Sequence, residues 1–186
     1  MPPKIRITPQ MITQAAFDIV RSEGAEALNA RRIAQKLDCS TQPVLYSFKT
    51  VDEIRAEVYR MADEFHTGYI MPAEDVQISP LMALGLNYIR FGHEEKHLFR
   101  FLFQSNMLGD NVQSLFDSPA LEGIIGIVAA STGMDEAAAR KSFMTFFAVA
   151  HGYASLLANN AMEYDEKLLE SSLEIVHRCC VGGDRG

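Results

Sequence analysis

Apolar residues recur every three or four positions along most of this chain, whereas no segment alternates apolar and polar residues like a half-buried strand. The helical spacing is clearest between Pro9 and Gly24. Thr8 is expected to cap this helix and Gly24 to end it. Its apolar face is formed by Ile12, Ala15, Ala16, Ile19 and Val20. Similar patterns predict helices over about 80–92, 94–108, 118–132, 135–160 and 164–180. The predicted fold class is therefore all-α, with about nine helices.

The composition is that of an ordinary globular protein. The length of 186 residues suits one domain, or a small module joined to a larger one, and 48% apolar residues are enough for a core. The longest apolar stretch, 143–158, is too short for a membrane span. The first residues lack the apolar block of a signal peptide, and three cysteines give no zinc-ligand spacing. We expect a cytoplasmic protein with no membrane contact, metal or cofactor.

The charge is divided unevenly along the chain. Residues 1–50 carry a net charge of +3, whereas residues 51–186 carry −10. A basic segment on an acidic body indicates that only the N-terminal segment meets a polyanion.

Two further short helices follow the first. Asn29 is expected to cap one of them, and after a tight turn at 38–40 Ser40 is expected to cap the other. The second of these helices buries Val44, Leu45 and Phe48, while Gln42, Pro43, Tyr46 and Ser47 lie on its opposite, uncharged side. A longer helix, predicted over 50–71, begins with a capping box of Thr50 and Glu53.

Two short helices joined by a tight turn and braced by a third form a helix-turn-helix unit. The second helix of such a pair lies in the major groove of DNA, and its N-terminal residues contact base edges. Here these residues are Thr41, Gln42 and Pro43. Glutamine can bond adenine, and threonine or proline can contact the methyl group of thymine. Periodicity alone leaves open a second interpretation, in which 41–48 is merely a short surface helix.

This N-terminal segment resembles the DNA-binding segment of TetR/AcrR-family transcriptional regulators. The resemblance is carried by Ala15-Ala16, Glu23-Gly24, Arg31-Arg32-Ile33-Ala34, Ser40 and Phe48-Lys49, with a looser match at His151-Gly152. The chain differs from the family pattern at three places. Leu45 occupies the usual position of a phosphate-contacting tyrosine, with Tyr46 one place later. Asp38 replaces a turn glycine, and Val51 replaces a basic residue.

The resemblance implies a ligand-responsive transcriptional regulator, a repressor, that binds a palindromic operator in double-stranded DNA as a homodimer. Residues 1–50 form the DNA-binding domain, helix 50–71 links it to the body, and residues 51–186 bind a small apolar effector and dimerise. Taken together with the helix-turn-helix pattern, the expected DNA-binding residues are Arg6, Asn29, Arg31, Ser40, Thr41, Gln42, Pro43, Tyr46 and Lys49.

The C-terminal body offers residues for both of its expected roles. The expected effector pocket is lined by Met61, Phe65, Phe99, Phe103, Met107, Phe116, Phe147 and His151, although such residues are often simply core. The expected dimer interface contains Tyr153, Leu157, Leu169, Leu173, Val176 and Cys180. The alternative is a monomer whose last two helices fold back on the body.

One motif points to different chemistry. Residues 93–97 match H-E-x-x-H, in which two histidines one helical turn apart bind zinc. The alternatives are therefore a zinc hydrolase, a metal-sensing pair formed by His93 and His97, or a TetR-like interaction module that does not bind DNA. Gly92 directly before the first histidine makes a poor context for the zinc helix. Because the chain has no nucleophile elbow, P-loop or dinucleotide-binding glycine pattern, we do not expect an enzyme.

Overall fold

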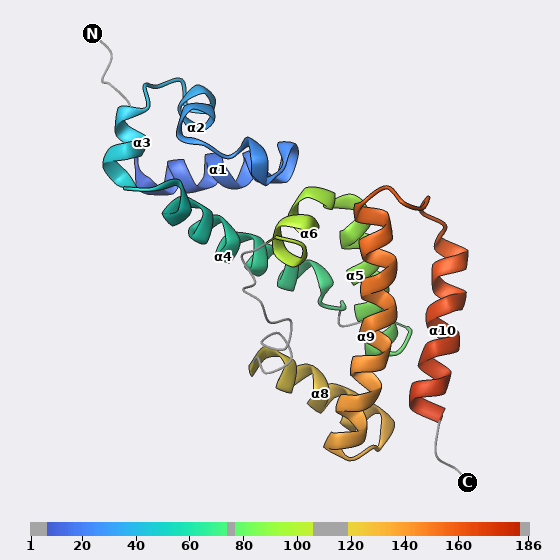
Figure 1. Cartoon of the computed structure of the whole chain (residues 1–186). Coiled ribbons are helices and arrows are strands. Elements are labelled where there is room, and N and C mark those ends of the chain that lie inside the picture. The colour runs from blue at the N-terminus through green and yellow to red at the C-terminus, as the bar shows by residue number, and fades with distance from the viewer. Residues whose placement is uncertain (1–6, 74–76, 106–118, 183–186) are drawn as a thin grey trace. The chain divides into compact units, whose positions relative to one another are not determined.

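The computed structural model describes residues 7–73, 77–105 and 119–182 (Figure 1). Within these ranges the protein has nine α-helices, one short 3₁₀ helix and no strand, which confirms the all-α prediction. The elements are α1 (Pro9–Glu23), η1 (Ala25–Ala27), α2 (Ala30–Lys36), α3 (Gln42–Ser47), α4 (Val51–Ile70), α5 (Pro80–Glu94), α6 (Lys96–Phe103), α8 (Pro119–Thr132), α9 (Glu136–Ala158) and α10 (Glu166–Gly182). None of the helices in the described ranges is long and apolar enough to cross a lipid bilayer.

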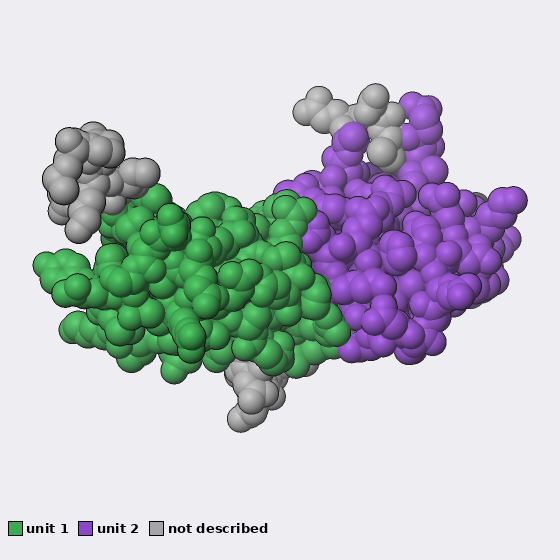
Figure 2. Space-filling view, turned by 90° about the horizontal axis from the view of Figure 1, so that it is seen from above, with its two compact units in different colours: residues 1–65, 97–107 green, residues 66–96, 108–186 purple. Residues whose placement is uncertain are grey.

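The chain packs into two compact units, which have separate colours in Figure 2. Unit 1 comprises residues 1–65 and 97–107, and unit 2 comprises residues 66–96 and 108–186. Helix α4 therefore begins in unit 1 and ends in unit 2, and almost all of α6 packs with the N-terminal helices. The boundary expected near residue 50 separates a DNA-binding domain from an effector-binding and dimerisation domain. The packing into units does not test these roles, so this boundary stays a prediction.

Unit 1 is built around the apolar face of α1. Thr8 caps this helix by accepting the Met11 N–H at 3.2 Å, and Gly24 ends it. The predicted face is confirmed, because all of its members are buried: Ile12, Ala15, Ala16, Ile19 and Val20. Helices α2 and α3 both contact α1. The ring of Tyr59 on α4 meets that of Phe101 on α6 edge-on, with centroids 5.9 Å apart.

The capping box at the start of α4 forms with one change. The Glu53 N–H donates to the Thr50 hydroxyl at 3.2 Å, as predicted. The Glu53 carboxylate, however, accepts the N–H of Lys49 at 2.9 Å, one residue before the expected partner. This pair of bonds fixes the backbone between α3 and α4.

Unit 2 is organised by α9, which contacts α5, α8 and α10 (Figure 1). Glycine permits the close approach of α5 and α9. A Cβ added at Gly92 would lie 2.8 Å from both the Cβ and the carbonyl oxygen of Ala154. Ala154 and its neighbour one turn earlier, Ala150, are fully buried, so these small residues serve contacts inside the protomer.

Candidate nucleic-acid interface

The start of α2 is tied to α1 by side chains. Asn29 caps α2 by accepting the Arg32 N–H at 2.9 Å, and its amide donates to the Ala27 carbonyl at 3.1 Å. The Arg32 guanidinium pairs with the Glu23 carboxylate at the end of α1, with 2.7 Å between Nη2 and Oε1. This bond lowers the pKa of Glu23 and raises that of Arg32. Both polar groups of Asn29 are thus used within the protein.

The turn between α2 and α3 depends on Asp38, which has a left-handed backbone conformation with φ of +50°. The N–H of Cys39 donates to the Ala34 carbonyl at 3.0 Å, and that of Asp38 donates to the Gln35 carbonyl at 3.3 Å. These two bonds form a Schellman motif, the usual end of a helix before a left-handed residue. Aspartate tolerates this conformation better than most residues other than glycine, so the turn forms without the glycine.

The predicted start of α3 is wrong by one residue. Ser40 lies outside the helix, and the N-cap is Thr41, whose side chain makes no capping hydrogen bond. The backbone of Thr41 is already helical, with φ of −68° and ψ of −17°. A side-chain cap requires an extended backbone at the capping residue, so the helical conformation of Thr41 accounts for the missing capping bond.

The exposed side of α3 is larger and more apolar than the sequence analysis predicted. Val44 is fully buried, as expected, but the predicted burial of Leu45 is wrong, because this side chain is 54% exposed. Gln42 is also exposed, Pro43 is partly buried, and Tyr46 is 92% exposed. Leu45 follows Gln42 by three positions and therefore shares its side of the helix. A helix of six residues needs only one buried row, and Val44 supplies it.

The basic residues of unit 1 divide into paired and unpaired groups. Lys36 lies 3.6 Å from the Asp18 carboxylate, Arg55 lies 3.5 Å from Asp52, and Arg21 lies over the Phe65 ring at 4.7 Å. In the part of the chain that the structure describes, Arg31 and Lys49 are exposed and form no ion pair. These two cations are therefore available for phosphates. Arg6, the other expected phosphate contact, lies outside the described residues.

The residues expected to line the effector pocket are divided between the two compact units. Unit 1 contains Met61, Phe65, Phe99 and Phe103, whereas unit 2 contains Phe147 and His151. Phe99 is fully buried, and its ring lies 5.0 Å from that of Phe103. Met107 and Phe116 lie outside the described residues.

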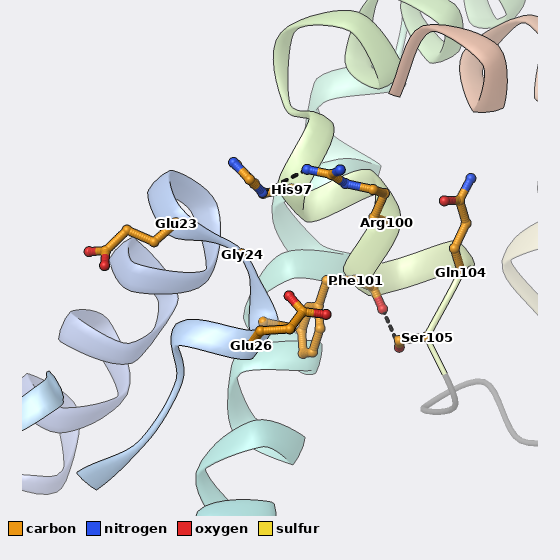
Figure 3. A pocket seen from close by; sticks show the side chains of 9 residues that line it. Glu23, Gly24, Glu26, His97, Arg100, Phe101, Gln104 and Ser105 are labelled. Atoms are coloured by element: carbon orange, nitrogen blue, oxygen red, sulfur yellow. Dashed lines mark hydrogen bonds between the residues drawn. The ribbon is translucent and has the colours of Figure 1, made fainter. Parts of the chain in front are cut away.

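A groove of about 450 Å³ is present in unit 1, and none of the expected pocket residues lines it. Figure 3 shows Glu26 on one side and His97, Arg100 and Gln104 on α6 and just after it. The Arg100 guanidinium donates to Nδ1 of His97 at 2.9 Å. Charged and polar side chains thus dominate the lining, which does not suit an apolar effector.

In unit 2 a buried polar pair lies among aromatic rings. The Tyr88 hydroxyl lies 2.9 Å from Nδ1 of His151, and burial raises the pKa of Tyr88 well above 10 while lowering that of His151. Both groups are therefore neutral near pH 7, and the tautomer of His151 decides which of the two donates. The rings of Phe147 and His66 lie 5.2 and 5.5 Å from that of Tyr88. The sequence analysis identified His151 and Phe147 but missed Tyr88 and His66, because helical periodicity marks them only as core positions.

The expected dimer interface is partly incorrect. Leu157, Leu169 and Leu173 are fully buried in unit 2, so they belong to the core of the protomer. Tyr153, Val176 and Cys180 are partly exposed. The large apolar residues that remain exposed on α9 and α10 are Leu156 (46%), Leu168 (48%) and Ile175 (56%). We refer to these three residues, together with Tyr153, as the α9–α10 apolar face.

The H-E-x-x-H motif does not have the geometry of a zinc site. Helix α5 ends at Glu94, and the motif continues through Glu95 into the separate helix α6. His93 stacks on Tyr164, with ring centroids 4.5 Å apart, and His97 accepts a hydrogen bond from Arg100. Among the described residues, no three potential metal-binding side chains gather at one place. The zinc hydrolase alternative assumed one helix through the motif, and this assumption is wrong, because the helix is interrupted at Glu95.

Comparison with known proteins agrees with this architecture. Residues 81–178 match the family model described as "Tetracyclin repressor-like, C-terminal domain". No curated protein matches the chain. A transcriptional regulator from Rhodococcus sp. Rha1 has a similar structure, with a TM-score of 0.70 and 19% identity, over 95% of this chain and 97% of that one. A TetR-like transcriptional regulator from Rhodococcus sp. RHA1 has a TM-score of 0.67 and 18% identity, over 99% and 100% of the two chains. The multidrug binding protein EbrR, complexed with imidazole, has a TM-score of 0.58 and 22% identity, over 94% and 95%.

Proposed function

This chain belongs to the TetR-like family of transcriptional regulators, and we propose that it binds duplex DNA through α3 of unit 1. The observation that carries the proposal is which basic residues of unit 1 form ion pairs and which do not. Arg31 and Lys49, which lie before and after α3 in the chain, form no ion pair among the described residues, whereas Arg32, Lys36 and Arg55 do. Cations without internal partners gain most from phosphate contacts, which supply affinity and register. Gln42 then supplies a base contact, with adenine as its preferred partner.

The proposed regulator is a homodimer that binds a palindromic operator. The α9–α10 apolar face supports this proposal, because Leu156, Leu168 and Ile175 expose apolar surface that a second copy can cover. Two symmetry-related α3 helices would then meet half-sites about one helical turn, ~34–36 Å, apart.

A small effector is proposed to bind in the C-terminal domain and to change DNA affinity. EbrR, a structural relative, is described as a multidrug binding protein complexed with imidazole, which supports a small-molecule effector here. The Tyr88–His151 pair would give such a ligand a polar contact within an aromatic environment. An effector can release the operator only if it binds the DNA-incompetent arrangement more tightly.

Selection of bound duplexes from a random pool tests the DNA proposal. A palindromic consensus is expected, and Gln42→Ala should weaken one base preference by about 1–3 kcal/mol. Lys49→Ala should weaken binding to every sequence and reduce the slope of log affinity against log salt by about one. Lys167→Ala is the matched control, because it removes the same charge from α10. Equal effects of the two lysine variants, or no enrichment of any duplex, would contradict the proposal.

A further inference from the structure

We propose that Leu45 contacts the C5-methyl group of a thymine in the major groove and so helps to determine the operator sequence. The proposal rests on the proposed function and adds to it a residue that neither family resemblance nor helical periodicity assigned to base contact. Its first support is position. Leu45 lies one helical turn after Gln42 on the same side of α3, so a groove that receives Gln42 also receives Leu45.

The second support is exposure. The Leu45 side chain is 54% exposed, although its neighbour Val44 is fully buried and a polar residue at this position would be better solvated. Exposed leucine is common on protein surfaces, but here it lies between Gln42 and Tyr46 in the sequence, both of which are exposed. An apolar side chain within a contact surface has to meet an apolar group to contribute to binding.

The third support comes from the charged residues of unit 1, which indicate what kind of partner α3 contacts. The helix itself carries no charge. Lys49 follows it by two residues and Arg31 lies on the preceding helix α2, and both are exposed cations without ion pairs among the described residues. An exposed apolar side chain in a unit with unpaired exposed cations fits a polyanion better than an apolar protein surface. Within the major groove the apolar group at a base edge is the thymine methyl. The expected partner of Leu45 is therefore an A·T pair next to the base contacted by Gln42.

Removal of the methyl group from the DNA tests this contact without altering the protein. In the selected consensus duplex, each thymine of a half-site is replaced in turn by deoxyuridine, which keeps every hydrogen-bonding group. At one position per half-site we expect binding to weaken about fourfold, the factor for one buried methyl group. Leu45→Ala should bind the thymine and uracil duplexes equally at that position. Gln42→Ala should weaken binding but keep the fourfold difference, which separates the two contacts.

The outcomes distinguish the inference from the function on which it rests. If the wild type binds its consensus but no uracil substitution weakens binding, Leu45 contacts no methyl group and the inference is overturned while the proposed function stands. The inference is also overturned if Leu45→Ala keeps the full thymine preference. If the wild type binds no duplex in a salt-dependent manner, the proposed function itself fails. Because Leu45 is more than half exposed, its truncation should leave the circular dichroism spectrum and the melting temperature unchanged.

Discussion

Acidification should destabilise this protein through His66, a buried histidine near the end of α4. Its side chain is 8% exposed and lies against the rings of Tyr88 and Phe91, with centroids 5.5 and 4.9 Å away. Burial lowers the pKa of His66 from its ordinary value of 6.5 to about 4, because the apolar surroundings disfavour the charged imidazolium. In the unfolded chain the same ring is solvated and has its ordinary pKa.

The sign and size of the effect follow from this difference. Above pH 6.5 the ring is neutral in both states and His66 has no influence on the pH dependence. Between pH 6.5 and about 4 the unfolded chain binds a proton that the folded chain does not, so the free energy of unfolding decreases as the pH falls. The full loss is about 3 kcal/mol, and about 2 kcal/mol of it is reached by pH 5.

Urea unfolding of the wild type and His66→Phe, followed by circular dichroism at pH 7.5, 6 and 5, measures this loss. Burial also lowers the pKa of His151 and His177, so the wild type alone reports several groups at once. The difference between the two proteins isolates His66, and a packing change caused by phenylalanine adds only a constant. Both proteins are compared at one concentration, because dimerisation would make stability depend on concentration. If the free energies of unfolding of the two proteins changed in parallel with pH, the reasoning about His66 would be refuted.

Glycine substitutions test two further features by the same unfolding assay. Gly24 has φ of +93° and ψ of +166°, a conformation that is essentially restricted to glycine, so Gly24→Ala should lower the free energy of unfolding by about 1–3 kcal/mol. An unchanged stability would show that the end of α1 can rearrange at no cost. Gly92→Ala should destabilise by about 1–3 kcal/mol, because the new Cβ would lie 2.8 Å from the backbone of Ala154. The matched control is Gly68→Ala, another helical glycine with no other atom within 4 Å of the new Cβ, which should stabilise by up to about 1 kcal/mol. Equal effects of the last two variants would contradict the close approach of α5 and α9.

The sequence was sufficient to predict structural features that depend on residues close to one another in the chain. The Thr8 and Asn29 caps, the buried face of α1 and the end of α2 at Asp38 all depend on residues within a few positions of one another. The predicted capping of α3 by Ser40 was wrong because two adjacent residues, Ser40 and Thr41, are both common N-cap types. No side chain caps α3, because capping depends on the backbone conformation of the turn, which side-chain type does not report.

Features that depend on tertiary packing could not be predicted in the same way. Periodicity identified the apolar stripe of α10 but not what covers it, and the structure covers Leu169 and Leu173 with the rest of unit 2. The surface left for a partner is the α9–α10 apolar face, which includes Leu168 and Ile175. Likewise, net charge marked the N-terminal segment as basic, but only the ion pair of Arg32 with Glu23 distinguishes it from the adjacent Arg31. The DNA-binding proposal depends on that distinction, because a cation already held by a carboxylate must break its pair before it can neutralise a phosphate.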